Sequence, residues 1–154
     1  MAGRRPRAVF DANVLLRIIL SRKPEGVAAA LWQLLQEGRF ELVSSEPLLK
    51  ELEDTLLVPE LVDVHGWGAE RIKDYMLALR EVAVTVPGRG SVDLPELAQR
   101  DAKDLPLIAA ALEAEAAIVT QDADLLDLAG LESLQGLEIL DPLDFLRRLR
   151  ATVN

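Results

Sequence analysis

Segments with the patterns of β-strands and α-helices alternate along most of this 154-residue chain. Short apolar runs that suit strands lie at 7–10, 40–43, 84–86, 116–119 and 137–140, and amphipathic stretches separate most of them. Parallel strands need crossover connections, which are usually helices that pack on the faces of the sheet. The alternation therefore predicts an α/β fold with a mainly parallel central sheet and helices on both faces.

Length and composition suit one domain with an aliphatic core. Half of the residues are hydrophobic but only 4% are aromatic. We expect a single domain over residues 1–154, with 1–5 as a flexible basic tail. No apolar run approaches the roughly 18 residues that span a bilayer, and the basic start lacks the apolar region of a signal peptide. The expectation is a cytoplasmic protein without a membrane partner.

The charged and metal-binding residues exclude several classes of site. The formal net charge is −9, which disfavours a general surface for polyphosphates but suits a partner with a basic segment. The chain has no cysteine and one histidine, His65. Disulfides, thiol catalysis and cysteine-based metal sites are excluded, and a histidine-rich zinc site is implausible. Any metal site would have to be built from oxygen ligands.

Two acids stand where predicted strands end and helices begin. Asp11 follows the apolar run 8–10, and Asp122 follows 116–119 after Thr120 and Gln121. The carboxyl ends of parallel strands meet at one edge of the sheet, where such folds bind ligands. Aspartate is also a favoured helix N-cap, so each position has a purely structural explanation. Asn13 and Thr120 would add further side-chain oxygens at this edge.

Other acids leave alternatives open. Asp104 precedes a helix with Pro106 in its first turn, so it either caps that helix or presents a carboxylate at the sheet edge. Asp101 belongs to a long connection, 87–103, and is expected to face water. Asp124 competes with Asp122 for a cap role.

Two glutamates have no single assignment from the sequence, and the other side chains of note are expected to have packing or surface roles. Glu51 and Glu53 flank the apolar stripe of a helix expected over 46–57, and periodicity alone does not choose between them. Residues 59–68 are predicted to be irregular, with His65 and Trp67 in packing or surface roles. Trp32 is expected in the core or at a dimer contact. The terminal helix is expected to bury leucines 143, 146 and 149.

Several acids together suit a hard cation. Mg²⁺ and Mn²⁺ prefer oxygen ligands, and clustered carboxylates repel one another unless a cation lies among them. Such an ion can activate water and stabilise the charge that develops during phosphodiester cleavage. This chemistry needs neither cysteine nor histidine.

Four motifs, taken in order, resemble those of the PIN-domain family. They are Val-Phe-Asp-Ala-Asn at 9–13, Ser-Ser-Glu-Pro-Leu-Leu-Lys-Glu at 44–51, Asp-Ala-Lys-Asp-Leu-Pro at 101–106 and Ile-Val-Thr-Gln-Asp-Ala-Asp at 118–124. The chain is similar in particular to the VapC-like ribonucleases, the toxins of toxin–antitoxin pairs. The resemblance covers about residues 7–145. It implies a three-layer α/β/α sandwich and metal-dependent endonucleolytic cleavage of single-stranded RNA.

The resemblance also assigns site residues. The four family acids fall on Asp11, Glu51, Asp104 and Asp122, which would hold one or two Mg²⁺ or Mn²⁺ ions and carry the catalysis. Asn13 and Thr120 match positions of polar groups near the metal, and Asp124 is an auxiliary ligand or a cap. Gln121 departs from the small residue common before the last acid. Basic residues expected to guide RNA are Arg17, Lys50, Arg89, Arg100 and Lys103.

The implied partners are a cognate antitoxin, which would insert a basic segment at the acidic cleft, and a second copy of the chain in a homodimer. Three alternatives stay open. Asp11-Ala-Asn13 loosely resembles the start of haloacid-dehalogenase-like phosphatases, although Asn13 replaces their second acid. A receiver domain would need paired acids after the first strand. An inactive PIN-like scaffold or RNA-binding module is the non-enzyme alternative.

Overall fold

The computed structural model describes residues 5–21, 24–87, 105–128 and 136–151. Several predictions fall outside these ranges. They concern residues 1–4, most of the connection 87–103, and the side chains of Asp101, Asp104, Arg89, Arg100 and Lys103.

The centre of the molecule is a five-stranded sheet in which every pair of neighbours is parallel. The strand order is β3-β2-β1-β4-β5, so the strand that comes first in the sequence lies in the middle. The strands are β1 (Arg7–Phe10), β2 (Glu41–Ser45), β3 (Val84–Val86), β4 (Ala117–Val119) and β5 (Ile139–Leu140). The predicted α/β fold with a parallel sheet is confirmed.

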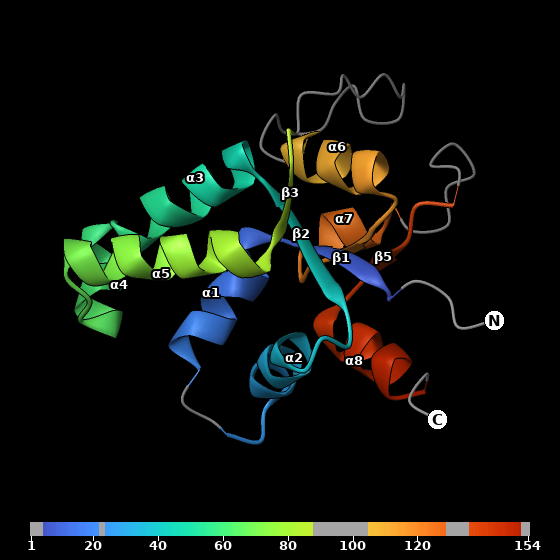
Figure 1. Cartoon of the computed structure of the whole chain (residues 1–154), viewed down its shortest axis with the longest axis horizontal. Helices are drawn as coiled ribbons and strands as arrows, with labels where there is room; N and C mark the ends of the chain where they lie inside the picture. Colours follow the sequence, from blue (N-terminus) through green and yellow to red (C-terminus); the bar gives the residue numbers. More distant parts are fainter. Residues whose placement is uncertain (1–4, 22–23, 88–104, 129–135, 152–154) are drawn as a thin grey trace.

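Helices cover both faces of this sheet (Figure 1). The helices are α1 (Ala12–Leu20), α2 (Val27–Gln36), α3 (Glu46–Leu56), α4 (Pro59–His65), α5 (Ala69–Val82), α6 (Leu105–Ala114), α7 (Ala123–Leu126) and α8 (Pro142–Ala151). In Figure 1, α6 and α7 lie above the sheet, and α1, α2 and α8 lie below it. The helices α3, α4 and α5 form an arm on the left, beyond the ends of β1 and β2.

Strand alternation divides the core into two clusters, because successive side chains point to opposite faces. Ala8 and Phe10 pack with residues of α1, α2, α3, α5 and α8. Val9, between them, packs with residues of α6 and α7. The core is aliphatic as expected, apart from one group of rings. The three phenylalanines of the chain, Phe10, Phe40 and Phe145, lie with ring centroids 5.2–6.0 Å apart.

Two local predictions were wrong. Residues 59–65 form the helix α4 where an irregular segment was expected. Pro59 stands in its first turn, where a missing N–H costs nothing, and Gly66 ends it with a left-handed φ of 69°. In α8 the buried stripe is Pro142, Phe145, Leu146 and Leu149, whereas Leu143 points outward and is 41% exposed.

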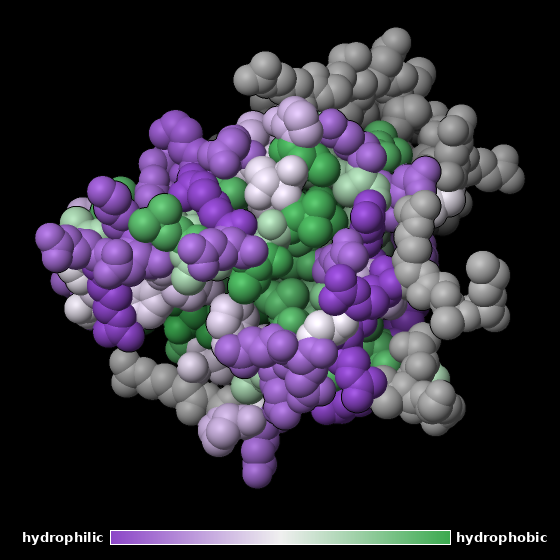
Figure 2. All heavy atoms as spheres, in the orientation of Figure 1, coloured by the Kyte–Doolittle hydropathy of each residue, from purple (hydrophilic) through white to green (hydrophobic). Residues whose placement is uncertain are grey.

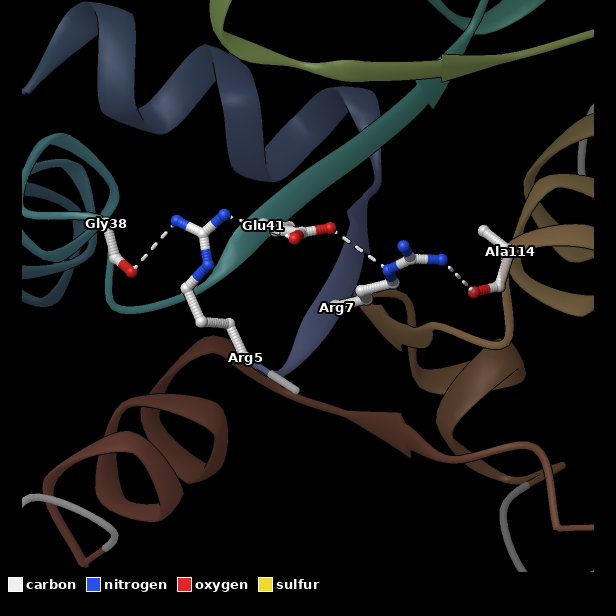
Figure 3. Close-up of polar contacts among 5 residues, drawn as sticks. All are labelled: Arg5, Arg7, Gly38, Glu41 and Ala114. Carbon is white, nitrogen blue, oxygen red and sulfur yellow. Dashed lines mark hydrogen bonds and ion pairs between the residues drawn. The ribbon is translucent and has the colours of Figure 1, made fainter. Parts of the chain in front are cut away.

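The amino edge of the sheet is closed by a polar cluster (Figure 3). The carboxylate of Glu41, at the start of β2, accepts hydrogen bonds from Arg5 at 3.2 Å and from Arg7 at 3.0 Å. The same guanidinium groups donate to the carbonyl oxygens of Gly38 and Ala114. These contacts tie the starts of β1 and β2 to the chain just after α2 and to the end of α6.

The face seen in Figure 2 has a polar arm and an apolar band. Hydrophilic side chains gather over α3 and α5, and apolar side chains follow β3 and β2 through the middle of the view. β3 is an edge strand of three residues, and Val84 on it is 38% exposed. Such a short edge offers little backbone for pairing with another strand. None of the helices in the described part of the chain has the length and apolarity to cross a bilayer.

Candidate active site

Asp11 lies at the carboxyl end of the central strand. β1 and β4 pair in register, with Phe10 opposite Val119, so Asp11 is level with Thr120. The N–H of Asp11 continues the ladder by donating to the carbonyl of Val119 at 3.0 Å. Its own carbonyl accepts from Val14 and Leu15, which starts α1. The backbone of Asp11 thus belongs to the sheet on one side and to the helix on the other.

The carboxylate of Asp11 does not cap α1. Asp11 occupies the N-cap position, but its side chain makes no hydrogen bond to an N–H of the helix. Its Oδ2 instead accepts a hydrogen bond of 2.8 Å from the hydroxyl of Thr120, at the end of the neighbouring strand. The structural explanation of Asp11 as a helix cap is therefore wrong. The half-buried carboxylate of Asp11 is therefore directed along the carboxyl edge of the sheet, toward the end of β4.

Thr120 connects the two acids that end β1 and β4. It is fully buried, donates through Oγ1 to Asp11 and accepts at the same atom from the N–H of Asp122 at 3.0 Å. A hydroxyl has one proton to donate, so these two bonds make Asp11 the acceptor and fix the orientation of its carboxylate. The sequence indicated a hydroxyl at this strand end, but it did not indicate the connection.

Asp122 does cap its helix. Its Oδ1 accepts from the N–H of Asp124 at 2.9 Å, and this contact starts α7. The competition between the two aspartates is thereby resolved, with Asp122 half-buried at the edge and Asp124 exposed. The cap bond engages one carboxylate oxygen, so capping and metal binding are not alternatives for this residue.

Glu51 lies on a different flank of α3 from Glu53, although both are half-buried. Glu51 comes one turn after Leu48, which packs with Val9 and with residues of α6. Glu53 comes one turn after Leu49, which belongs to the cluster on the opposite face of the sheet. Glu51 therefore differs from Glu53 in lying beside the leucine that packs with Val9 and α6. Its role as a ligand stays a prediction.

The two aspartates at this edge, Asp11 and Asp122, have no ion-pair partner within the described residues. None of the ion pairs there includes Asp11 or Asp122, whereas Lys50 is paired with Asp54 at 3.3 Å. Oxygen donors without a counter-charge fit Mg²⁺ or Mn²⁺. In the described ranges no three acids or histidines come close enough to hold an ion. The predicted fourth acid, Asp104, lies outside them.

Two cavities include Gln121, the residue before Asp122, in their lining. One of about 630 Å³ lies between α1 and α2 and is lined mostly by apolar side chains. The other, of about 340 Å³, shares Arg17, Val27, Gln121 and Pro142 with it. Arg17 and Gln121 are exposed and line both cavities, so they form a common rim. Gln121 is the residue that departs from the family pattern, and it stands at this rim.

His65 has a structural role. The N–H of Trp67 donates to its Nδ1 at 2.8 Å, so Nδ1 is an acceptor and the proton is assigned to Nε2. Nε2 then donates to the carbonyl of Leu56 at 3.0 Å. Both ring nitrogens are engaged in joining the end of α3 to the start of α5. This agrees with the expectation that His65 packs rather than catalyses.

Comparison with known proteins supports the fold. The uncharacterized protein MJ1680 of Methanocaldococcus jannaschii is 28% identical over 122 residues, covering 79% of this chain and 74% of that protein. A chain of VapBC2 from Rickettsia felis, solved bound to a DNA fragment from their promoter, superposes with a TM-score of 0.58 at 15% identity. It covers 88% of this chain and 98% of its own.

Two further structures are similar. PAE2754 from Pyrobaculum aerophilum has a TM-score of 0.61 at 13% identity and covers 96% of this chain and 90% of its own. A chain of VapBC-1 from nontypeable Haemophilus influenzae has a TM-score of 0.54 at 14% identity, with 89% and 98% covered. At such identities these structures speak for the fold alone. The sequence itself matches the PIN domain over residues 7–124. The chain therefore belongs to the PIN-domain family.

Proposed function

We propose that this protein is a nuclease that cleaves single-stranded RNA with Mg²⁺ or Mn²⁺, and that it is the toxin of a toxin–antitoxin pair. The observation that carries the proposal is the connection from Asp11 through Thr120 to Asp122. It holds two half-buried acids at the ligand-binding edge of the sheet without a cation among the described residues. The side chain of Asp11 does not cap α1, so a helix-capping role does not account for this acid.

The chain's own residues have separable tasks in this proposal. Asp11 and Asp122 supply carboxylate oxygens from two adjacent strands, and Glu51 and Asp104 complete the set. Thr120 keeps the carboxylate of Asp11 oriented through the hydrogen bond that its hydroxyl donates to Oδ2. A divalent cation, when bound, supplies Lewis-acid activation and charge neutralisation for phosphodiester hydrolysis. Asn13 and Asp124 are exposed beside Asp11 and Asp122 and are auxiliary ligands in this scheme.

The RNA would approach along the rim formed by Arg17 and Gln121. Arg17 lies on α1, six residues after Asp11, and forms no ion pair with another described residue. An exposed guanidinium close to an acidic edge can bind a phosphate without neutralising the acids. The overall charge of −9 makes such local cations necessary for a nucleic-acid substrate.

The partner in this proposal is a small antitoxin with a basic segment. Two of the similar structures are VapBC proteins, and the negative charge of this chain would attract a basic partner. We expect the segment to contact the acid edge, so replacing the four acids with alanine should weaken binding strongly. Unchanged tight binding would contradict an acid-centred contact. A homodimer and a single domain over 1–154 stay predictions, which solution mass and limited proteolysis would check.

The proposal is tested by incubating the protein with labelled single-stranded RNA, with Mn²⁺ and with a chelator. We expect cleavage that requires the metal and that Asp11→Asn abolishes. Glu41→Gln is the matched control, because it neutralises an acid at the opposite edge of the sheet. Cleavage that survives in Asp11→Asn would contradict the proposed site. Release of phosphate from a phosphomonoester without any RNA cleavage would favour the dehalogenase-like alternative.

A further inference from the structure

A third cavity lies where α1 ends, and neither Asp11 nor Asp122 lines it. It measures about 560 Å³ and is bounded by α1, α2 and α5. Ile18, Ile19, Trp32, Trp67 and Tyr75 line it. Since the chain has two tryptophans and one tyrosine, every indole and phenol of the protein contributes to this one cavity. The acid site uses none of these side chains.

The ring of Trp67 is held in place on several sides. The guanidinium of Arg71 lies 4.5 Å from its centroid, and the rings of His65 and Tyr75 both lie 5.4 Å from it. The backbone N–H of Trp67 also donates to His65, which is bound to the carbonyl of Leu56. The aromatic wall is therefore preorganised, and a ligand that stacks on it has little ordering cost to overcome.

Tyr75 adds a polar requirement to this wall. Its hydroxyl oxygen is buried and has no hydrogen-bond partner among the described residues. A tyrosine hydroxyl is protonated at neutral pH and can donate its proton, and burial raises the pKa of Tyr75 further, to about 12. Buried polar groups without a partner are rare in proteins and call for an explanation, such as a bound molecule. A suitable ligand would bring an acceptor to this hydroxyl.

We propose that this cavity binds one unpaired nucleobase, stacked on the aromatic wall and accepting a hydrogen bond from Tyr75. For the source of that base, the RNA substrate, the inference rests on the proposed function. The rim of the cavity matches the rest of a nucleotide. Arg71 is exposed and can reach a phosphate, and Asp74 is exposed and can accept from an exocyclic amino group.

The same helix connects the cavity with the acid edge. Asp11 precedes the first residue of α1, and Ile19 lies eight residues later, which is about 12 Å along the helix. About four stacked nucleotides, at roughly 3.4 Å each, cover that distance. A base held here would therefore belong to the same short strand as the scissile phosphate, a few nucleotides away.

A nucleobase fits better than an aromatic side chain of a protein partner. Phenylalanine would leave the hydroxyl of Tyr75 without an acceptor, and tryptophan offers only another donor. A base offers carbonyl and ring-nitrogen acceptors together with a flat face, and stacking on aromatic side chains tolerates every base. The cavity is thus expected to select single-stranded RNA without selecting its sequence strongly.

Tryptophan fluorescence tests this directly, because both tryptophans line the cavity. The full chain is titrated in chelator with uncharged nucleosides, and free tryptophan amide controls for absorbance. We expect saturable quenching. Tyr75→Phe should weaken nucleoside binding about tenfold while leaving the melting temperature equal or higher, since it removes an unpartnered hydroxyl. Asp11→Asn should bind nucleosides like the native chain.

Two results would overturn the inference. One is the absence of saturable quenching by nucleosides while acrylamide quenches both tryptophans. The other is quenching by aromatic dipeptides but not by nucleosides, which would identify a protein-binding site. The proposed nuclease function fails separately. Nucleoside binding without RNA cleavage would support the base site but contradict the RNA substrate as the source of the base. RNA cleavage without nucleoside binding would support the nuclease function but contradict the base site.

Discussion

At the amino edge of the sheet the carboxylate of Glu41 lies between two guanidinium groups, whereas at the carboxyl edge Asp11 meets a neutral hydroxyl. Arg5 and Arg7 contact Glu41 at 3.2 and 3.0 Å, and both also donate hydrogen bonds to backbone carbonyl oxygens. Asp11 and Asp122 are bound through Thr120 and form no ion pair with a described residue. The ion-paired carboxylate of Glu41 stabilises the packing of the strands. Carboxylates without an ion-pair partner at the ligand-binding edge of the sheet are suited to binding an added cation.

The largest effect should separate two aspartates that look alike. Asp122 caps α7 after β4, and Asp141 caps α8 after β5 by accepting from Asp144 at 2.7 Å. Asparagine caps helices about as well as aspartate, so neither Asp122→Asn nor Asp141→Asn should unfold the protein. We expect Asp122→Asn to lower RNA cleavage by more than about 100-fold, beyond the usual loss for an outer-shell group.

Asp141→Asn should cleave RNA within about twofold of the native rate, because the same chemical change then falls outside the four-acid set. Rates are compared at equal concentrations of folded protein. Equal losses in the two variants would show that capping or general charge, rather than position, controls activity.

A smaller effect should follow from breaking the connection itself. Thr120→Val keeps the size of this fully buried side chain but removes the hydrogen bonds to the carboxylate of Asp11 and from the backbone N–H of Asp122. Groups that orient a metal ligand typically contribute about 10- to 100-fold, and we expect a loss in that range. The loss should appear as a higher Mn²⁺ requirement, and Thr120→Ser should restore most of the activity. A uniform loss at saturating Mn²⁺ in both variants would speak for damage to packing instead.

The smallest effect concerns stability at the amino edge. Glu41→Gln should lower the free energy of unfolding by about 1 kcal/mol, as expected for partly exposed ion pairs, without changing cleavage. Asp11→Asn should leave stability unchanged or raise it, because it relieves repulsion between acids. Urea unfolding of both variants measures the difference. A larger loss of unfolding free energy in Asp11→Asn than in Glu41→Gln would contradict the distinction between the two edges.

Much of the fold follows from local sequence signals, and parts of the site do not. The strand expected over 7–10 is β1, and the helix expected over 46–57 is α3, which ends one residue earlier at Leu56. α4 was missed because a helix of seven residues with no buried side chain shows no clear periodicity. Leu143 was misplaced because 143, 146 and 149 share helical spacing with the actual stripe at 142, 145, 146 and 149.

The position of the two edge acids could be predicted, but their contacts could not. Parallel pairing puts Asp11 and Thr120 at the same level. No local pattern indicates that the side chain of Asp11 accepts a hydrogen bond from Thr120 instead of capping α1. Glu51 and Glu53 are equivalent by periodicity, and their difference depends on what packs beside Leu48 and Leu49. Such information comes from tertiary structure. The cavity shared by both tryptophans is of the same kind.

The central claim, that the carboxyl-edge acids form a cation site, is tested most directly by Mn²⁺ binding measured with thermal unfolding and calorimetry. The native chain and Glu41→Gln should bind Mn²⁺ alike. Each should gain about 2.7 kcal/mol of stability at a hundredfold excess over the dissociation constant. Asp11→Asn should show neither the heat of binding nor the gain. Undiminished Mn²⁺ binding in Asp11→Asn, or its loss in Glu41→Gln, would contradict the account.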